Sequence, residues 1–302
     1  MKRSGNTVFL FLLLTIPLWA QTEAGLAFLK LPVDARSAAM GEAATAAARD
    51  ASAAYWNPAL LAGNSSKSLV LMHNAYLADI AQEFVAFQFA AGKNNLAVSL
   101  NLINIPGIDI RGERPTEQPA GKTEAINLAA ALSYARSVKN NWSVGLSLKY
   151  LYEKYYLEDA GGYAIDLGIV KSNLFNKPLT LGVTLQNLGK MSPLQNEATK
   201  LPLLLRGGLL YQTPFILFDK PVQTTFDVDY LVHDNQLRLH TGLQVSLLKN
   251  LDGRAGLLHD SDHLRYSLGF GLNYKQYQLS YAFSPYPYNL GYAHRFSLHW
   301  SF

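Results

Sequence analysis

Histidine and aspartate side chains crowd one short stretch near the C-terminus, at His259, Asp260, Asp262 and His263. Imidazole nitrogens and carboxylate oxygens are the groups with which proteins bind zinc and related metals. The spacing of these four residues matches no diagnostic pattern of metal ligands, and they fall between two runs that alternate like strands. We therefore predict a solvated turn that holds no metal.

Other residues that are often catalytic give no stronger signal. His240 and His299 are expected to face inward on strands. A hydrolase would need a serine nucleophile beside such a histidine, and no arrangement in the sequence identifies one. The glycines of residues 269–271 lie in a predicted strand with no helix after them, which excludes a phosphate-binding loop. The sequence therefore predicts a protein that is not an enzyme and has no cofactor.

Charged residues recur at positions that an alternating strand would turn inward. Asp227 and Asp229 lie on a predicted strand between those that carry Arg206 and Arg238, so cross-strand ion pairs are expected. The predicted polar network comprises Asp166, Arg206, Asp227, Asp229, Arg238, Arg265 and Arg295, with Arg136, Lys149 and Arg254 on the same inner face. Two roles stay open: these charges hold an internal segment or line a channel, or they only keep the interior wet.

Alternating strands are the elements that must position these charges. From Trp142 to Tyr152, large apolar residues alternate with mostly small or polar ones, and residues 292–302 repeat the pattern up to Phe302. Many runs approach the roughly 10 residues that a tilted transmembrane strand needs. No helical period competes with this alternation. It predicts an all-β fold, apolar outside and polar inside.

We predict a closed, antiparallel transmembrane β-barrel of fourteen strands. The predicted strands span residues 67–77, 81–91, 95–106, 123–136, 141–155, 161–172, 177–188, 200–212, 220–232, 235–248, 251–259, 262–273, 276–284 and 292–302. If the last strand ends in the periplasm, the longest connections, 107–122 and 189–199, face outward. Most inward turns are then short. Outer-membrane barrels show this asymmetry.

The N-terminus reads as an export signal. Lys2 and Arg3 precede an apolar run, and Ala20 offers a small residue for cleavage, so residues 1–20 are predicted to be a signal peptide. The chain has no cysteine, which excludes both disulfides and a lipid-modified N-terminus. A formal charge of +4 is too small to indicate a nucleic-acid partner. We predict the cell outer membrane, with its lipid, as the location.

Two stretches ahead of the predicted strands read FLKLPVDARSAAMGEA, residues 28–43, and YWNPALLA, residues 55–62. They resemble the opening of the PorV/PorQ group of FadL-like outer-membrane barrels. Residues 72–80 resemble the first hairpin of that group, and residues 163–168 and 185–189 resemble later ones. The matching residues taken as a plug signature are Pro32, Arg36, Met40, Gly41, Tyr55, Trp56, Asn57 and Pro58. Glu42 departs from the group, which more often has a small residue there.

The resemblance implies that residues 21–66 form a plug inside a barrel of residues 67–302. It implies a component associated with type IX secretion, whose partners would be secreted cargo or other secretion components. The alternative is a FadL-like channel that takes up hydrophobic small molecules. Likeness to other barrels also predicts that the barrel assembly machinery reads the terminal aromatic residue, Phe302. Inward glycines such as Gly145, Gly182, Gly242, Gly269 and Gly271 either receive the plug or only relieve curvature.

Overall fold

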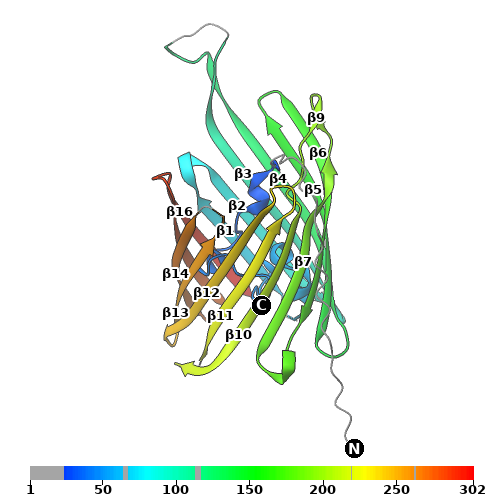
Figure 1. Ribbon diagram of the computed structural model, residues 1–302, viewed down its shortest axis with the longest axis vertical. Helices are drawn as coiled ribbons and strands as arrows, with labels where there is room; N and C mark the ends of the chain where they lie inside the picture. Colours follow the sequence, from blue (N-terminus) through cyan, green and yellow to red (C-terminus); the bar gives the residue numbers. More distant parts are fainter. Residues whose placement is uncertain (1–23, 64–66, 113–116, 219, 262) are drawn as a thin grey trace, which may run out of the picture.

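A computed structural model describes residues 24–63, 67–112, 117–218, 220–261 and 263–302. The predicted signal peptide, residues 1–20, lies outside the described residues. The wall is one closed barrel in which each strand pairs antiparallel with its neighbours and β1 pairs with β16 to close the ring (Figure 1). The prediction of an all-β barrel with fourteen wall strands is confirmed.

The wall strands are β1 (Ser68–Ala75), β2 (Ala81–Ala91), β3 (Asn94–Ile110), β4 (Gly121–Ser137), β5 (Trp142–Tyr155), β6 (Glu158–Lys171), β7 (Leu179–Met191), β10 (Leu204–Leu217), β11 (Lys220–Leu231), β12 (Gln236–Leu248), β13 (Leu251–His259), β14 (Leu264–Tyr274), β15 (Tyr277–Tyr286) and β16 (Gly291–Ser301). A small hairpin of β8 (Pro193–Leu194) and β9 (Glu197–Ala198) lies in the connection from β7 to β10. Single turns of 3-10 helix, η3 (Leu77–Asp79) and η4 (Leu174–Asn176), follow β1 and β6.

Several predicted strand boundaries differ from the observed ones, most of all in β3 and β10. β3 continues to Ile110 and β4 already begins at Gly121, so this hairpin is longer than predicted. β10 begins at Leu204, not at residue 200, because Pro202 has no N–H for a strand ladder. Its other end passes an irregularity after Gln212 and reaches Leu217.

Burial follows the predicted alternation. Leu148, Leu268 and Phe296 are about half exposed on the outer surface, whereas Ser147 and Ser297 on the inner face are buried. Arg136 is an exception, and its predicted inward direction was wrong. It pairs across the ladder with Val144, which is outward and 41% exposed. Arg136 lies one residue from the end of β4, where a long cationic side chain can reach polar surroundings.

Residues 24–63, the lumen segment, lie within the barrel (Figure 1). Their elements are η1 (Ala27–Lys30), α1 (Ala35–Ala39), α2 (Ala53–Trp56) and η2 (Pro58–Gly63). α1 packs against β13, β14, β15 and β16, and η2 packs against β3, β4, β5 and β6. Alanine suits this position because it adds little volume between wall and segment. No helix in the described ranges is long and apolar enough to cross a membrane.

The lumen segment runs the length of the barrel. We call outward the end that carries the long connection from β3 to β4. At that end the Ala24 N–H donates to Asp234 Oδ1 (2.9 Å), in the turn between β11 and β12. At the inward end, Gln88 Nε2 donates to the Leu61 carbonyl (3.1 Å) and Ser137 Oγ to the Ala62 carbonyl (3.3 Å). The chain therefore enters at the outward mouth and leaves where β1 begins.

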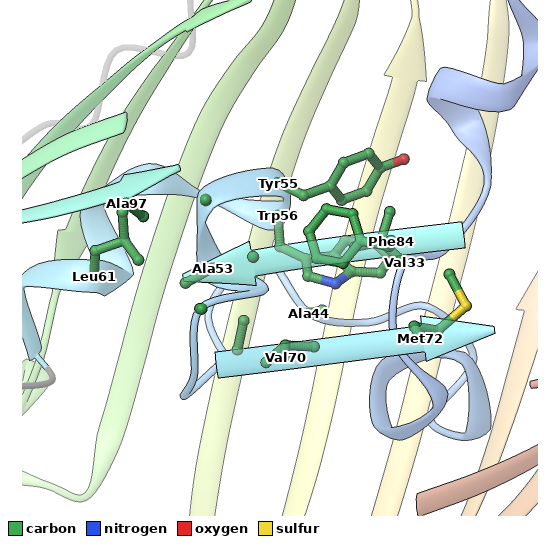
Figure 2. Close-up of a cluster of buried hydrophobic side chains, with 14 of the residues drawn as sticks. Val33, Ala44, Ala53, Tyr55, Trp56, Leu61, Val70, Met72, Phe84 and Ala97 are labelled. Atoms are coloured by element: carbon green, nitrogen blue, oxygen red, sulfur yellow. The ribbon is translucent and has the colours of Figure 1, made fainter. Parts of the chain in front are cut away.

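An apolar core joins this segment to the first two strands (Figure 2). Trp56 and Tyr55 pack edge to face, with ring centroids 5.2 Å apart. Val70 and Met72 of β1 and Phe84 of β2 turn toward them and are buried. The middle of the inner face of β1 and β2 is thus apolar, and the segment covers it and excludes water.

Candidate functional site in the lumen and at the outward mouth

Glycines on the inner wall let the segment approach the strands closely. A Cβ at Gly242 would lie 2.5 Å from the Met40 carbonyl, and one at Gly269 would lie 2.6 Å from Ala39 Cβ. At Gly145 and Gly182 the added carbon would meet the backbone of Ala59 and of Thr45. Gly271 instead faces the guanidinium of Arg254. Close approach of the segment therefore accounts for four of the five inward glycines singled out in the sequence.

Two aromatic residues of the plug signature hold the segment's own fold. Trp56 Nε1 donates to Asp34 Oδ2 (2.7 Å), and the Tyr55 hydroxyl lies 2.8 Å from the Leu29 carbonyl and 2.7 Å from the Leu31 carbonyl. Asp34 also caps α1 by accepting from the Ser37 N–H (2.7 Å). Burial raises the pKa of Asp34, Asp50 raises it further, and these hydrogen bonds act against the rise. Asp34 was not among the residues singled out from the sequence.

Arg36 and Asn57 attach the segment to itself and to the wall. The Arg36 guanidinium donates to Gln244 Oε1 (3.1 Å) on β12, to Gln223 Oε1 (3.2 Å) on β11 and to the Ala47 carbonyl (2.9 Å). Asn57 Nδ2 donates to the Thr45 carbonyl (3.0 Å). Both side chains are buried. A buried guanidinium needs such acceptors, because an unpaired one costs several kcal/mol.

Among the remaining signature residues, Gly41 bonds to the wall through its backbone. Gly41 adopts a φ of +66° and donates its N–H to Ser267 Oγ (3.1 Å) on β14. Its carbonyl accepts from His240 Nδ1 (2.7 Å) on β12. Met40 is 1% exposed beside it, and Pro32 and Pro58 are also buried. A side chain at position 41 would collide with the β12 and β13 backbone, so only glycine fits.

The predicted polar network is divided into separate sites. Asp229 Oδ2 lies 3.4 Å from Arg206 Nε and 3.1 Å from His240 Nε2, and all three side chains are buried. The Arg206 guanidinium stacks over Trp56, 4.9 Å from the ring centroid. The neighbouring Asp227 accepts the Thr45 N–H (2.8 Å). The strand order therefore brings together Arg206, Asp227 and Asp229, whose contacts lead to the lumen segment, to each other and to His240 on β12.

Asp166 lies at a different place, beside an irregularity of the wall. Lys149 Nζ is 2.6 Å from Asp166 Oδ2, and the Asn187 N–H donates to Asp166 Oδ1 (2.8 Å). Gln186 and Asn187 on β7 both turn inward opposite Asp166, and Asn187 has a φ of +61°. This is a β-bulge, which places two residues against one. The strict alternation used in the sequence analysis could not find it.

The other three arginines are apart from these sites. Arg295 Nη1 contacts Ser284 Oγ (3.4 Å). Arg238 donates from Nη2 to Gln236 Oε1 (2.9 Å), and Arg265 stacks on Tyr286 (5.4 Å). Arg238 and Arg265 line an outward cavity together with Lys30, whose Nζ is 3.0 Å from Asp234 Oδ2. The outward mouth is thus a second polar site, which the sequence analysis did not separate from the lumen.

The histidine-rich turn forms hydrogen bonds of its own. His263 Nε2 lies 2.7 Å from the Tyr288 hydroxyl, and the His263 N–H donates to Asp260 Oδ1 (2.9 Å). His259 Nδ1 lies 3.2 Å from the His263 carbonyl. Asp262 is outside the described residues. Among the residues that the structure describes, no group of three or more His, Cys, Asp or Glu could hold a metal.

Phe302 lies directly after the last strand, on the outer surface. Its N–H donates to the Lys67 carbonyl (3.0 Å), and its ring packs 4.5 Å from Trp300. The centroid of the Phe87 ring, on β2, lies 6.1 Å from that of the Phe302 ring. The terminal aromatic residue therefore sits at the seam where β16 meets β1. Its predicted recognition by assembly machinery stays a prediction.

The closed wall with an apolar outer surface and a polar lumen defines an outer-membrane β-barrel. The family described as type IX secretion system protein PorV matches residues 20–172, just over half of the sequence. The chain belongs to this PorV family, which agrees with the resemblance found in the sequence. No curated protein matches the chain.

Solved structures share the fold at low sequence identity. The toluene transporter TodX of Pseudomonas putida is 11% identical, with a TM-score of 0.66 over 88% of this chain and 96% of TodX. The Ralstonia pickettii toluene transporter TbuX is 12% identical, with a TM-score of 0.63 over 89% of this chain and 98% of TbuX. A Pseudomonas aeruginosa FadL homologue is 11% identical, with a TM-score of 0.63 over 89% and 98%. These identities support the fold alone.

Proposed function

We propose that this protein is a non-enzymatic component of type IX protein secretion that binds its partners at the cell surface while its own lumen stays filled. Membership of the PorV family supports the secretion role. The observation that carries the rest is the attachment of residues 24–63 to the inner wall. Secreted cargo and other secretion components are the expected partners.

Attachment around the circumference argues against passage through this barrel. The lumen segment accepts a hydrogen bond from Gln186 on β7 and donates hydrogen bonds to Asp227 on β11 and Ser297 on β16, which lie on different sides of the wall. A net contribution of about 1 kcal/mol for each such bond adds up over the many that would have to break together. The segment is therefore expected to stay in place while the protein works.

The hairpin of β3 and β4 offers a surface for a partner. The ladder from β2 to β3 ends at Ala81 and Asn104, and the ladder from β4 to β5 ends at Ala125 and Tyr155. Beyond these pairs, and among the described residues, residues 106–110 and 121–124 have only each other as strand partners, above the rest of the wall (Figure 1). Both edges of this ribbon keep backbone groups free to pair with another strand.

The test is recovery of partners from detergent-solubilised membranes by a tagged protein. The full chain should recover secretion components or exported proteins. A variant in which Asn-Gly replaces residues 106–124 should keep a folded barrel, because a two-residue hairpin turn then joins the native strand pair Ile105 and Ala125, and should no longer recover those proteins. The matched control replaces residues 195–196, between β8 and β9, by Asn-Gly. Recovery of nothing by the full chain would contradict the partner role, and equal recovery by both variants would contradict the role of the hairpin.

Uptake of a hydrophobic small molecule is the second candidate. The fold is shared with the toluene transporters TodX and TbuX. An apolar cluster at the outward end, in which Leu26 and Phe28 meet Leu151 and Met191, is the observation that favours it. Tyr55 and Trp56, in contrast, are buried, and their polar atoms donate hydrogen bonds within the segment itself. Mass spectrometry of bound lipid in the purified protein tests this candidate.

A further inference from the structure

A cavity of about 250 Å³ opens at the outward mouth, between the lumen segment and the wall. The segment contributes Lys30, Leu31 and Glu42, and the wall strands contribute Arg238 and Arg265. Below it the lumen is filled by residues 24–63. A ligand that enters this cavity from outside therefore meets a closed floor and can only dock there.

The cationic side chains that line the cavity differ in how many hydrogen bonds and ion pairs they make. Lys30 is paired with Asp234 at 3.0 Å, and Arg238 donates to Gln236 from two nitrogens. Arg265 only stacks on Tyr286, and its N–H groups donate to no group within the described ranges. A guanidinium with unused donors is suited to bind a carboxylate through two parallel hydrogen bonds.

Glu42 supplies the opposing charge in an unusual backbone position. It has a φ of +68°, directly after Gly41 at +66°. A side chain in this left-handed region costs roughly 1–2 kcal/mol, which glycine avoids. Glu42 lines both the outward cavity and a smaller one of about 20 Å³ that it shares with Arg265. Its carboxylate makes no ion pair among the described residues. Asp260 also lines the cavity and accepts the His263 N–H (2.9 Å). Arg238 and Arg265 therefore face two acids, of which Glu42 has no such partner within the described ranges.

Apolar and aromatic groups complete the lining. Tyr76 and Tyr286 pack edge to face, with ring centroids 5.4 Å apart, and Leu31 and Leu290 lie beside them. Such a wall suits the apolar part of a ligand whose charged end reaches Arg265.

We propose that the outward cavity binds the carboxylate at the end of an apolar or aromatic chain, with Arg265 and Arg238 as its cationic partners. Glu42 lowers the affinity by competing for the same arginines. The inference rests on the proposed function, since an exported polypeptide would offer its α-carboxylate here. A fatty acid would offer the same group, so the experiment must separate these two sources.

Binding is measured on the full chain in detergent with two pairs of probes. One pair is an acetylated pentapeptide that ends in phenylalanine, with a free carboxylate or as the amide. The other pair is dodecanoate and its methyl ester. We expect the free carboxylate of at least one pair to bind about tenfold more tightly than its neutral counterpart. The pair that shows this difference identifies the source.

Variants then assign the effect to the cavity. Arg265→Gln should remove the preference for the carboxylate without changing binding of the neutral probe, and Glu42→Gln should strengthen carboxylate binding by about threefold or more. Arg136→Gln, which removes the same charge from the outer surface near the inward end, is the control and should change neither. Equal binding of both members of each pair, or an unchanged preference in Arg265→Gln, would overturn the proposal. Recovery of secretion partners in the same preparation would leave the proposed function standing.

Discussion

Asp229 is the residue on which the buried charges of the lumen depend. It lies 3.4 Å from Arg206 and 3.1 Å from His240, and Arg206 in turn covers Trp56 of the lumen segment. Removing one partner of a buried pair costs about 3–5 kcal/mol, because the other charge is left unpaired. We predict that Asp229→Asn lowers the free energy of unfolding by an amount in this range.

Urea unfolding of the barrel in detergent, followed by the heat-dependent shift on gels, measures the effect. Asp109→Asn is the matched control, because Asp109 pairs with Arg111 at the exposed surface. That variant should lose no more than about 1 kcal/mol. Equal losses in both variants would show that the buried pair has no special weight.

Gly256 is the residue where the wall and the segment approach most closely. A Cβ there would collide with the backbone of Met40 and Gly41. Gly256→Ala should therefore destabilise the barrel by about 1–3 kcal/mol, as overpacking does. Gly207→Ala is the control, since a Cβ at Gly207 meets nothing within 4 Å. If both variants unfold at the same urea concentration as the parent, the close packing described here is wrong.

Single residues were predictable where strand parity alone decided their direction. Arg206 and Asp229 were expected to meet because their strands are neighbours, and they do. Gln244, Gln223 and Ser267 were not singled out, although each bonds to the segment. An inward polar residue has the same sequence pattern whether it contacts the segment or water. Only the path of the segment distinguishes them.

At the scale of elements, the turn between β11 and β12 holds the outward end of the segment through Asp234. Burial acts to raise the pKa of Asp234, but the Ala24 N–H and Lys30 outweigh it and lower that pKa. An aspartate whose pKa is lowered on folding stabilises the fold above its ordinary pKa. That contribution is lost as the pH falls through the lowered value.

We therefore predict that residues 24–31 stay protected from hydrogen exchange at pH 7 and pH 5 and lose protection in strong acid. Asp234→Asn should remove part of this protection already at pH 7. Exchange rates are compared after correction for the intrinsic effect of pH. Identical protection of the variant and the parent at every pH would show that Asp234 does not hold this end.

The last strand carries a prediction about assembly. Phe302 packs on Trp300 at the seam of β16 and β1 and is half exposed. Deleting Phe302 should reduce the amount of folded barrel in the outer membrane severalfold, since few contacts of the folded wall are lost and the assembly step is affected instead. Phe302→Tyr, which keeps an aromatic ring, should assemble normally. Normal membrane yield after the deletion would remove the basis for a terminal signal.

Strand number and order were predictable because the period of two persists along the wall. The bulge at Gln186 and Asn187 was not, because one inserted residue leaves the composition of a strand unchanged. The extension of β3 to Ile110 was also missed, since beyond the rim both faces are exposed and alternation fades. Strands can thus be predicted from the sequence where one face meets lipid, and less well elsewhere.

For the whole molecule, the central claim is that residues 24–63 fill the lumen from the outward mouth to the inward end. The closed wall, the glycines that admit the segment and the buried hydrogen bonds all agree with this path. On the proposed function, secretion partners would work beside the filled barrel rather than through it.

Labelling of single cysteines on intact cells tests this path most directly, because the chain has no cysteine of its own. Ala27 is exposed at the outward cavity, Tyr288 lies in an outward turn, and Lys93 lies in an inward turn. With a membrane-impermeant maleimide, Ala27→Cys and Tyr288→Cys should be labelled on intact cells and Lys93→Cys only after permeabilisation. Labelling of Ala27→Cys only after permeabilisation, with Tyr288→Cys labelled on intact cells, would contradict the account.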